Sequence, residues 1–384
     1  MNDFKENTNG NLKILVCVNE FFGAWNTAKG GYGFLARKLL PEALIRGGTT
    51  VHICLGRSKK LFCVESMQTE DGFKLIKLPK LRYFAAKVVN KYDVIISIEA
   101  VVDYLFSLKS RLKRPIIFWI QDPRTKIDWK EISTVTLATE QCYWNDKTYY
   151  LVNICYKLGL VKFVTQAYFL RKKAIDLYNL PKDTDIAFLP NPLPQNTELK
   201  EEKKENIIFL GRLDSVKRGW LFCEIAKRMP NYNFFVLGAS TDNIEKEKNK
   251  ILLKYNNVPN LHFLGHLDGE EKALQLSKAK ILINTSIHEA LPVSFLEAFS
   301  YGVTVISNQN PDGLVEKYGR YVGTSLGDGW DDVDKFIKEI NYIMNHENER
   351  KKLAEAASEY VNTVHSFENF RNIFYKLVDE CLKS

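Results

Sequence analysis

Short apolar runs alternate with longer amphipathic segments along most of the chain, and this alternation limits the possible folds more than any other feature. It predicts parallel β-strands joined by helical crossovers, an α/β fold. Several of the runs are apolar throughout, which is typical of strands that helices cover on both faces. The predicted strands form two series: Lys13–Val18, Thr50–Leu55, Phe73–Leu78, Tyr92–Ile98, Pro115–Ile120, Lys162–Thr165 and Asp185–Leu189, and then Asn206–Leu210, Asn233–Leu237, Leu261–Leu264, Lys280–Asn284 and Val303–Ser307. Amphipathic helices are predicted over Tyr32–Arg46, Gln166–Tyr178, Val333–Val364 and Ser366–Leu382.

The stretch between the two strand series is the predicted domain linker. Leu189–Glu205 contains three prolines followed by a run of charged residues, a composition typical of linkers. A chain of 384 residues is long enough for two domains. We therefore expect domains over residues 1–192 and 193–365, with ligands bound in a cleft between them at the carboxyl ends of the strands.

Composition and cysteine usage exclude several classes of protein. Hydrophobic residues make up 45% and charged residues 26% of the chain, which is a globular rather than a disordered mixture. No apolar run is long enough to span a membrane, and Met1–Gly10 lacks the apolar core of a secretory signal. The seven cysteines include no Cys-x-x-Cys pair, and the six histidines include no His-x-x-x-His pair on a predicted helix. We therefore expect no metal site and a reducing cytosol.

Positive charge is concentrated in the first half of the chain. Residues 1–190 contain 29 Lys and Arg against 18 Asp and Glu, and the remainder contains 25 against 28. A basic half would suit nucleic acid, an anionic membrane or an anionic substrate, or it is a solvated face without a partner. Nucleic acid is not expected, because no recognised module is present. The aromatic and lysine-containing stretch Gln141–Leu160 is either a membrane or saccharide surface or a packed helix.

Three glycines lie where the first strand leads into the first helix. Gly30, Gly31 and Gly33 would let the backbone approach a phosphate closely, and the following helix would offer free N–H donors. The spacing matches neither a dinucleotide fingerprint nor a Walker loop. A plain tight turn is therefore an equally good interpretation.

Two cations follow the first strand of the second series. Arg212 comes directly after Leu210-Gly211, and Lys217 comes five residues later. The rigid fork of an arginine and the mobile charge of a lysine together suit a diphosphate. Their position at the end of a strand favours this hypothesis over a pair of solvated surface cations.

Two glutamates are spaced by seven residues near the fourth strand of this series. Glu289 lies in the loop after the strand, and Glu297 lies on the helix that follows Pro292. A carboxylate on a mostly apolar helix needs hydrogen-bond donors. Sugar and ribose hydroxyls would supply them, and so would a neighbouring cation.

In combination these residues resemble the family-4 retaining glycosyltransferases (glycosyl transferases group 1) of GT-B fold. The order Gly-Arg-Leu, then Lys217, then Glu-x-Leu-Pro and Leu-Glu-Ala-x-x-x-Gly follows that family's pattern, and Leu189–Pro192 is similar to its entry into the linker. The resemblance implies two Rossmann-like doubly wound domains facing a central cleft. Residues 1–192 would take the acceptor and residues 193–365 the nucleotide sugar. The C-terminal helix, residues 366–384, would pack back on the first domain, although an ordinary final helix would show the same apolar stripe.

The resemblance also implies roles for the site residues. Arg212 and Lys217 would hold the diphosphate and stabilise the leaving group, Glu297 would hold the ribose hydroxyls, and Glu289 would face the donor sugar. The neighbours of Glu289 would complete the donor site: His288, Ala290, Leu291, Pro292 and Val293. Gly30, Gly31 and Gly33 would close on the diphosphate. No cofactor or divalent ion is implied beyond the donor itself.

The sequence departs from the family at two places. Many relatives have a histidine after the fifth strand, where this chain has Asp122, which would act in catalysis or merely cap a turn. His288 would contact the donor sugar or lie on the surface. Two Asp-x-Asp triplets, Asp183-Thr-Asp185 and Asp332-Val-Asp334, resemble a metal clamp, but they precede a strand and open a helix, so metal binding is not expected.

The resulting prediction is a hexosyltransferase-like enzyme of bacterial capsule, O-antigen or lipopolysaccharide synthesis. Its partners would be a nucleotide-sugar donor and a saccharide or lipid-linked acceptor. It would act in the cytoplasm, with weak peripheral contact with an anionic membrane at the inner face. The alternatives are a nucleotide-sugar 2-epimerase of the same fold and a non-catalytic basic binding protein.

Overall fold

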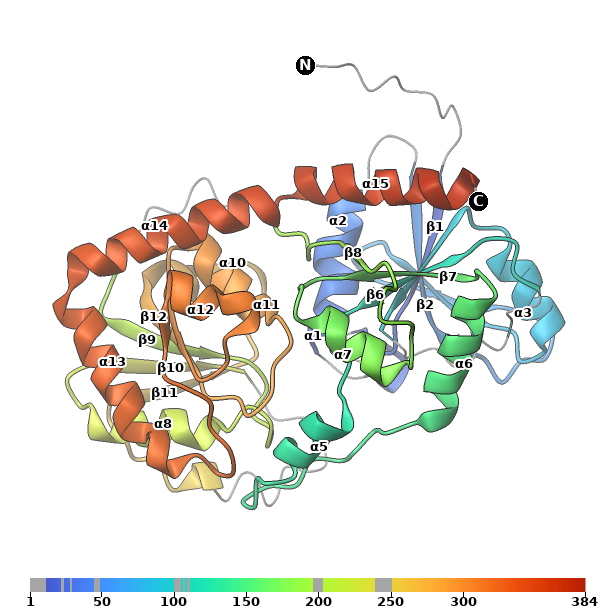
Figure 1. Ribbon diagram of the computed structural model, residues 1–384. Coiled ribbons are helices and arrows are strands. Elements are labelled where there is room, and N and C mark those ends of the chain that lie inside the picture. Colours follow the sequence, from blue (N-terminus) through green and yellow to red (C-terminus); the bar gives the residue numbers. More distant parts are fainter. Residues whose placement is uncertain are drawn as a thin grey trace. The chain divides into compact units, whose positions relative to one another are not determined.

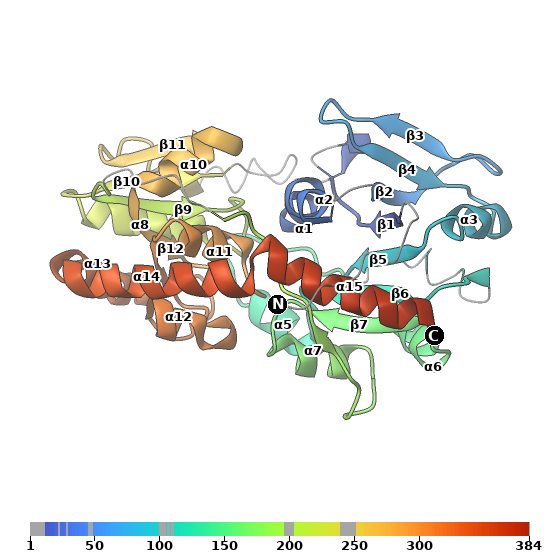
Figure 2. The same ribbon diagram turned by 90° about the horizontal axis from the view of Figure 1, so that it is seen from above.

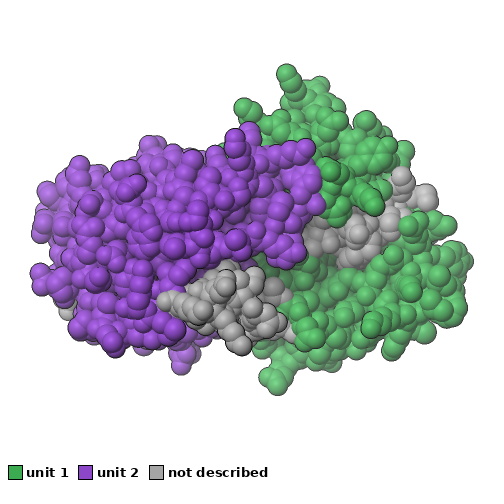
Figure 3. Space-filling view, turned by 90° about the horizontal axis from the view of Figure 1, so that it is seen from below, with its two compact units in different colours: residues 1–123, 145–192, 367–384 green, residues 124–144, 193–366 purple. Residues whose placement is uncertain are grey.

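The computed structural model describes residues 12–21, 24–27, 30–44, 49–99, 105, 108, 111–195, 203–238 and 251–383. Met1–Gly10 and residues 196–202 of the predicted linker lie outside them. The chain divides into two units (Figure 3): unit 1 holds residues 1–123, 145–192 and 367–384, and unit 2 holds residues 124–144 and 193–366. The division at Pro192–Leu193 falls in the predicted linker. Residues 124–144 differ from the prediction, because they lie in the first half of the sequence but belong to unit 2.

Unit 1 is built on an eight-stranded sheet in the order β3-β4-β2-β1-β5-β6-β7-β8 (Figure 2). Its pairs are parallel except β3–β4, which is antiparallel. β5 and β6 are buried along their whole length, in line with sequences that are apolar except for Ser97 in β5. The strands are β1 (Lys13–Cys17), β2 (Thr50–Arg57), β3 (Glu65–Gln68), β4 (Lys74–Leu78), β5 (Val94–Ile98), β6 (Ile116–Ile120), β7 (Val161–Thr165) and β8 (Ala187–Phe188).

The helices of unit 1 begin and end close to their predicted positions. The first predicted helix is a continuous segment in which a π-helical turn, η2, joins α1 to α2. Its predicted end at Arg46 lies outside the described residues. The elements are η1 (Ala24–Asn26), α1 (Gly31–Phe34), η2 (Leu35–Leu39), α2 (Leu40–Leu44), α3 (Arg82–Val89), α6 (Asp146–Lys157), α7 (Leu170–Leu177) and α15 (Phe367–Lys383).

The C-terminal helix α15 packs on unit 1, the first of the two placements that its sequence allows (Figure 1). Its Phe370 ring lies 5.8 Å from the ring of Trp119, a buried residue of β6. Arg371 and Tyr375 donate hydrogen bonds to backbone carbonyls at the end of α2. The apolar stripe of this helix therefore serves the core of the unit formed by the first half of the chain.

Unit 2 is built on a six-stranded parallel sheet in the order β11-β10-β9-β12-β13-β14. The order of the strands is that of a Rossmann sheet, with β9 as its first strand. The chain forms β10 and β11 on one side of β9 and then β12 on the other side. β9 and β12 are neighbours, so the topological switch point lies between them. The strands are β9 (Asn206–Leu210), β10 (Asn233–Leu237), β11 (Leu261–Gly265), β12 (Ala279–Asn284), β13 (Thr304–Ser307) and β14 (Arg320–Tyr321).

Helices cover both faces of the unit 2 sheet. Figure 1 shows α8 and α13 on one side and α10, α11 and α14 on the other. The helices predicted over Val333–Val364 are α13 and α14, which meet at His346, where the backbone leaves the helical conformation. The elements are α8 (Gly219–Arg228), α10 (Gly269–Lys278), α11 (Val293–Ser300), η4 (Pro311–Gly313), α12 (Leu314–Tyr318), η5 (Trp330–Asp332), α13 (Val333–Asn345) and α14 (Glu347–Val364).

Residues 124–144, which we call the strap, supply the remaining piece of unit 2. The strap contains α5 (Lys126–Ile132), whose start is fixed by a capping box between Thr125 and Asp128. Its Ile132 and Val135 belong to the same buried cluster as α8 and α13. The strap is therefore part of the hydrophobic core of unit 2 and not a surface attachment.

Candidate active site

The loop between β9 and α8 holds both predicted phosphate-binding cations, and one buried carboxylate fixes them. Asp214 is only 7% exposed; its Oδ1 accepts a hydrogen bond of 3.0 Å from the Lys217 backbone N–H, and its Oδ2 lies 3.2 Å from the Arg212 guanidinium. The Arg212 side chain is 42% exposed and that of Lys217 is 20% exposed. Arg212 therefore faces solvent, whereas Lys217 is mostly covered.

The covering partner of Lys217 is Glu289, from the loop after β12. The Lys217 Nζ lies 2.5 Å from Glu289 Oε1. The same oxygen accepts hydrogen bonds from Asn284 Nδ2 at 2.9 Å and from Ser286 Oγ at 2.6 Å. Among the described residues no hydrogen bond reaches the other oxygen, Oε2. Lys217 and Glu289 thus link the two halves of the sheet at the switch point, and Oε2 of Glu289 can accept a hydrogen bond from a ligand.

This environment keeps the Glu289 carboxyl ionised. Burial alone would raise its pKa, but the charge of Lys217 and the hydrogen bonds from Lys217, Ser286 and Asn284 outweigh burial and lower it. The Lys217 ammonium has three donors, of which Glu289 uses one. The pair can therefore offer donors to an anion and an acceptor to a hydroxyl at the same time.

Arg218, the residue just before α8, holds the β9–α8 loop to the loop after β12 by hydrogen bonds. It is fully buried and adopts a left-handed backbone conformation with φ of 47°. Its guanidinium donates to the carbonyl of Thr285 at 2.7 Å, to Ser325 Oγ at 3.0 Å and to the carbonyl of Gly327 at 3.0 Å. Burial lowers its pKa to about 10. The residue is therefore a structural cation, distinct from its neighbour Lys217.

The strap contacts both loops of the candidate site. His288, next to Glu289, is buried, and its Nδ1 lies 3.4 Å from Asp128 Oδ1 of the strap. This excludes the surface position that the sequence left open for His288. Glu140 of the strap accepts a hydrogen bond of 2.8 Å from Ser215 Oγ, which lies between the two cations in sequence.

Asp328 fixes the strap to the rest of unit 2. Its Oδ1 accepts hydrogen bonds from the backbone N–H groups of Thr136 at 2.8 Å and of Leu137 at 3.0 Å, and its Oδ2 accepts one from Thr136 Oγ1 at 2.5 Å. A fourth bond runs from the Gly327 N–H to Thr134 Oγ1. Because Arg218 binds the carbonyl of Gly327, the strap and the site loops share one hydrogen-bonded network.

Glu297 is paired with a lysine, which is the alternative that the sequence left open. Its Oε1 lies 2.6 Å from Nζ of Lys272 on α10, and the two side chains are 14% and 12% exposed. Pro292 is the cap of α11 and lies just before its first turn, and Ala290, Leu291 and Val293 connect Glu289 to that turn. A ribose-binding role for Glu297 stays a prediction, and it would share the carboxylate with Lys272.

The glycine loop of unit 1 has a carboxylate at the start of its helix. Gly30 caps α1, and the N–H of Gly33 donates to Glu20 Oε1 at 2.9 Å. A Cβ added to Gly30 would lie 2.5 Å from Glu20 Oε2, whereas one added to Gly31 would meet nothing within 4 Å. The helix terminus predicted for a phosphate is therefore occupied by the chain's own anion, which a phosphate would have to displace.

Asp122 lies in a turn that a buried glutamate holds. Glu99 is 8% exposed, follows β5 with φ of 56°, and its Oε2 accepts hydrogen bonds from the N–H groups of Gln121 at 2.6 Å and Asp122 at 2.8 Å. Its Oε1 accepts one from Tyr178 Oη at 2.7 Å. Burial raises the pKa of Glu99 despite these bonds. Asp122 is half-buried, so it is not simply an exposed turn residue.

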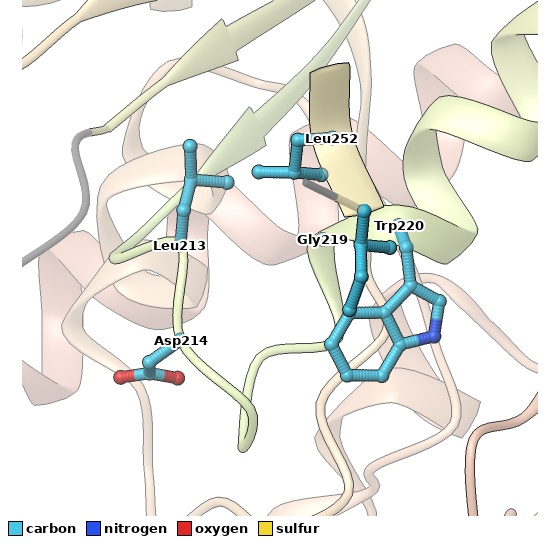
Figure 4. Close-up of a pocket in the computed structure, with 6 residues that line it drawn as sticks. Leu213, Asp214, Gly219, Trp220 and Leu252 are labelled. Carbon is cyan, nitrogen blue, oxygen red and sulfur yellow. The ribbon is translucent and has the colours of Figure 1, made fainter. Parts of the chain in front are cut away.

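A small hollow lies next to the β9–α8 loop of unit 2 (Figure 4). Leu213 and Leu252 point toward each other across it, and the Trp220 ring lines one side. The Asp214 carboxylate points away from the two leucines in the figure. A Cβ added to Gly219 would lie 2.8 Å from a methyl group of Leu213. The hollow therefore reflects the packing of the loop, and Asp214 is the one charged residue among those that line it.

The two Asp-x-Asp triplets differ in exposure. Asp183 and Asp185 are exposed in the turn before β8. Asp332 is buried and pairs with Lys335 at 2.7 Å, and Asp334 pairs with Arg228. Among the described residues no three His, Cys, Asp or Glu side chains gather in a way that could hold a metal ion.

Several supporting residues were missed by the sequence analysis. Asp214, Ser286, Asn284 and Glu99 all lie at or just beyond the carboxyl end of a strand, which is the signal that could have identified them. Arg218 gave no such signal, because its burial depends on carbonyl groups of distant loops. The contact of Asp128 with His288 depends on the placement of the strap, which no local pattern predicts.

Comparison with known proteins identifies the class to which this fold belongs. Two solved structures match nearly the whole chain: sucrose-phosphate synthase from Thermosynechococcus elongatus, with a TM-score of 0.70, 17% identity and coverage of 96% of this chain and 98% of that one, and HepE of Anabaena in complex with UDP-glucose, with a TM-score of 0.70, 11% identity and coverage of 96% and 100%. At these identities the likeness concerns the fold. The chain has the predicted GT-B fold of two Rossmann-like domains.

The family follows from the second half of the chain. Residues 194–360 match the family model of glycosyl transferases group 1. The O-antigen biosynthesis glycosyltransferase WbnH of Escherichia coli is 22% identical over 210 residues, 54% of this chain and 56% of that protein. A relative from Campylobacter jejuni subsp. jejuni serotype O:2 is 28% identical over 186 residues, 45% of this chain and 49% of that protein; it is the GalNAc-alpha-(1->4)-GalNAc-alpha-(1->3)-diNAcBac-PP-undecaprenol alpha-1,4-N-acetyl-D-galactosaminyltransferase. The matches span about half the length of these relatives. Residues 194–360 therefore match the glycosyl transferases group 1 family, as the resemblance predicted.

Proposed function

We propose that the protein is a retaining glycosyltransferase that moves a sugar from a nucleoside diphosphate sugar to a saccharide or lipid-linked acceptor in the synthesis of a bacterial surface polysaccharide. The observation that carries the proposal is the pairing of Lys217 with Glu289 at the switch point of the unit 2 sheet. Ligands of open α/β sheets bind at this place. The family match supports the reaction class, and the O-antigen and undecaprenol-linked relatives support the type of product.

The cations would act on the leaving group. Negative charge grows on the diphosphate as its bond to the anomeric carbon breaks, and cations already in place stabilise that charge without reorganising. Asp214 fixes both Arg212 and the backbone of Lys217, so the clamp is preorganised. We propose no metal ion in this role, because an arginine and a lysine supply the charge.

Glu289 would act on the donor sugar. Its Oε1 is saturated by Lys217, Ser286 and Asn284, which fixes the direction in which Oε2 points. An ionised carboxylate held in this way can accept a hydrogen bond from a sugar hydroxyl and favour positive charge developing at the anomeric carbon. Unit 1, with Asp122 and the glycine loop, would take the acceptor side.

The location that we propose is the cytoplasm, at the inner face of the cell membrane. Among the helices that the structure describes, none is both long and apolar enough to cross a bilayer. The lipid-linked acceptor in the name of the Campylobacter relative supports an acceptor presented at a membrane surface.

A thermal-shift panel of UDP, GDP, ADP and CMP sugars tests the proposal. A ligand at a hundred times its dissociation constant stabilises a protein by roughly 2.7 kcal/mol, which such a screen detects. The donor that raises the unfolding temperature is then incubated with a lipid-linked acceptor preparation, and the anomeric configuration of the product is determined by NMR. We expect one nucleotide class to stabilise the protein and the product to retain configuration. No stabilisation by any nucleotide sugar would refute the donor site, and an inverted product would refute the retaining mechanism.

A further inference from the structure

Two segments of unit 1 lie side by side and form one surface, which we call the basic apolar patch. The first segment is residues 57–64, from the last residue of β2 to the start of β3. The second is residues 79–91, which include α3. The N–H groups of Lys80 and Leu81 donate to the carbonyls of Lys60 and Leu61 at 2.8 and 3.1 Å. The rings of Phe62 and Phe84 meet edge to face with centroids 5.2 Å apart. The patch is therefore an ordered surface.

Large apolar side chains project from this patch into solvent. Phe62 is 56% exposed and Tyr83 is 55% exposed, and Leu61 and Leu81 are 44% and 41% exposed. A single exposed apolar residue is ordinary, but several together indicate an interaction surface. The backbone hydrogen bonds between residues 60–61 and 80–81 show that the four side chains lie on two neighbouring segments.

The same two segments contain only positive charge. Their residues include seven cations and no Asp or Glu: Arg57, Lys59, Lys60, Lys80, Arg82, Lys87 and Lys91. The Lys87 Nζ lies 4.5 Å over the ring of Tyr83. Within the described part of the chain, no carboxylate forms an ion pair with Lys59, Lys60, Lys80 or Arg82. The nearest acid in sequence, Glu65, accepts a hydrogen bond from Ser58.

We propose that the basic apolar patch docks onto an anionic lipid bilayer. Rings and branched side chains gain free energy by entering the boundary between headgroups and acyl chains, while lysines and arginines attract acidic headgroups. Nucleic acid would interact favourably with the cations but not with Leu61 or Leu81. The cations complement either anionic partner, and the exposed apolar side chains beside them favour a membrane over a nucleic acid. The inference concerns binding alone, so it stands or falls independently of the transferase reaction.

Helix α6 provides a matched control surface on the same unit. It also exposes apolar side chains, Tyr150 at 67% and Leu158, just after the helix, at 57%, and it has Lys147 and Lys157. Its first residue is the acid Asp146, however, and its cations are fewer. The patch variant is Phe62→Ser, Tyr83→Ser, Lys60→Gln and Lys80→Gln. The control variant is Tyr150→Ser, Leu158→Ser, Lys147→Gln and Lys157→Gln, which removes the same kinds of side chain.

The experiment measures cosedimentation of the full chain with lipid vesicles. Vesicles of phosphatidylcholine with about one third phosphatidylglycerol are compared with vesicles of phosphatidylcholine alone. We expect the parent protein to bind the anionic vesicles, to bind less at high salt, and not to bind the neutral ones. The patch variant should lose at least about tenfold in partition coefficient, and the control variant should bind like the parent. Equal unfolding temperatures of the three proteins show that the fold is unchanged.

Three results would overturn the proposal. The first is a parent protein that does not bind anionic vesicles, and the second is a patch variant that binds them as well as the parent does. The third is a patch that acts elsewhere: patch-dependent self-association in analytical ultracentrifugation, or patch-dependent RNA binding, without vesicle binding. Loss of binding in the control variant alone would assign the membrane surface to α6 instead.

Discussion

The two glutamates of the candidate site are held differently, and this predicts different kinetic effects. Glu289 has one oxygen saturated by Lys217, Ser286 and Asn284, at the switch point of the sheet. Glu289→Gln keeps the shape but removes the charge that favours the transition state, so it should lower kcat at least tenfold with little effect on nucleoside diphosphate affinity. Glu297→Gln should raise KM more than it lowers kcat, because ribose hydroxyls are the same in both states.

Steady-state kinetics of both variants checks these two roles, with circular dichroism as the control for folding. A Glu289→Gln enzyme as active as the parent would mean that the carboxylate only balances the charge of Lys217. If Glu289→Gln and Glu297→Gln both lose donor affinity alone, the two glutamates serve donor binding and not the chemical step. Since Glu297 is paired with Lys272, a Lys272→Met variant with normal KM would show that this lysine does not orient the carboxylate.

The buried glutamates Glu99 and Glu289 should affect the pH dependence of stability in opposite directions. The folded-state pKa of Glu99 is raised, so the folded protein holds this proton more tightly and loses stability as pH rises from about 4.5 through the raised pKa. The pKa of Glu289 is lowered, so its contribution is present above about 4.5 and is lost as pH falls through the lowered pKa.

Urea unfolding at a series of pH values measures both effects. Relative to the parent, Glu99→Gln should become more stable as pH rises from 4 to 8, because the amide does not ionise. The amide oxygen can still accept the hydrogen bonds from Gln121 and Asp122. Relative to the parent, Glu289→Gln should become less stable as pH rises through the lowered pKa to about 4.5, and the difference should stay constant above that. Differences that do not change with pH, or that change in the same direction, would show that the environments of these carboxyls have been misread.

At the scale of secondary-structure elements, the strap should matter for both stability and donor binding. Asp328 accepts three hydrogen bonds from Thr136 and Leu137, and the strap in turn contacts Ser215 and His288. Asp328→Ala should lower the free energy of unfolding by about 1–2 kcal/mol and weaken nucleoside diphosphate binding several-fold. Asp334→Ala removes an exposed acid of the same unit and is the control. Full donor affinity in a destabilised Asp328→Ala protein would limit the strap to a structural role.

The strands were largely predictable from the sequence, because burial on both faces demands unbroken apolar runs. β9 and β10 begin and end at the predicted residues. β3 was missed because it is a polar strand at the sheet edge, where three of its four residues are exposed.

The sequence suggested candidate site residues, but the contacts among them could not be predicted from it. Strand ends identified Arg212, Lys217 and Glu289, because ligand groups gather there. The pair of Lys217 with Glu289 joins residues 72 positions apart and depends on the strand order, which local patterns do not contain. The assignment of the strap to unit 2 failed for the same reason, since its apolar residues fit either core.

At the scale of the whole molecule, we expect catalysis without a metal ion. In the proposed site Arg212 and Lys217 would supply the positive charge that a divalent ion provides elsewhere, and Asp214 contacts the Arg212 guanidinium and the Lys217 backbone. Transfer activity should therefore persist in excess EDTA at more than about half of its untreated value. Loss of activity in EDTA with rescue by Mg²⁺ or Mn²⁺ would contradict this and would direct attention to Asp183 and Asp185.

Calorimetric titration with the nucleoside diphosphate of the preferred donor tests the central claim most directly. Arg212→Ala and Lys217→Ala should each weaken binding roughly 10- to 150-fold, because each removes a charge-assisted hydrogen bond to phosphate. Arg228, with 42% side-chain exposure and an acidic partner, matches Arg212, and Lys280, 13% exposed with two acidic partners, resembles Lys217. Arg228→Ala and Lys280→Ala should bind like the parent. If all four variants bind like the parent, the diphosphate does not lie at the switch point of unit 2 and the site assignment is wrong.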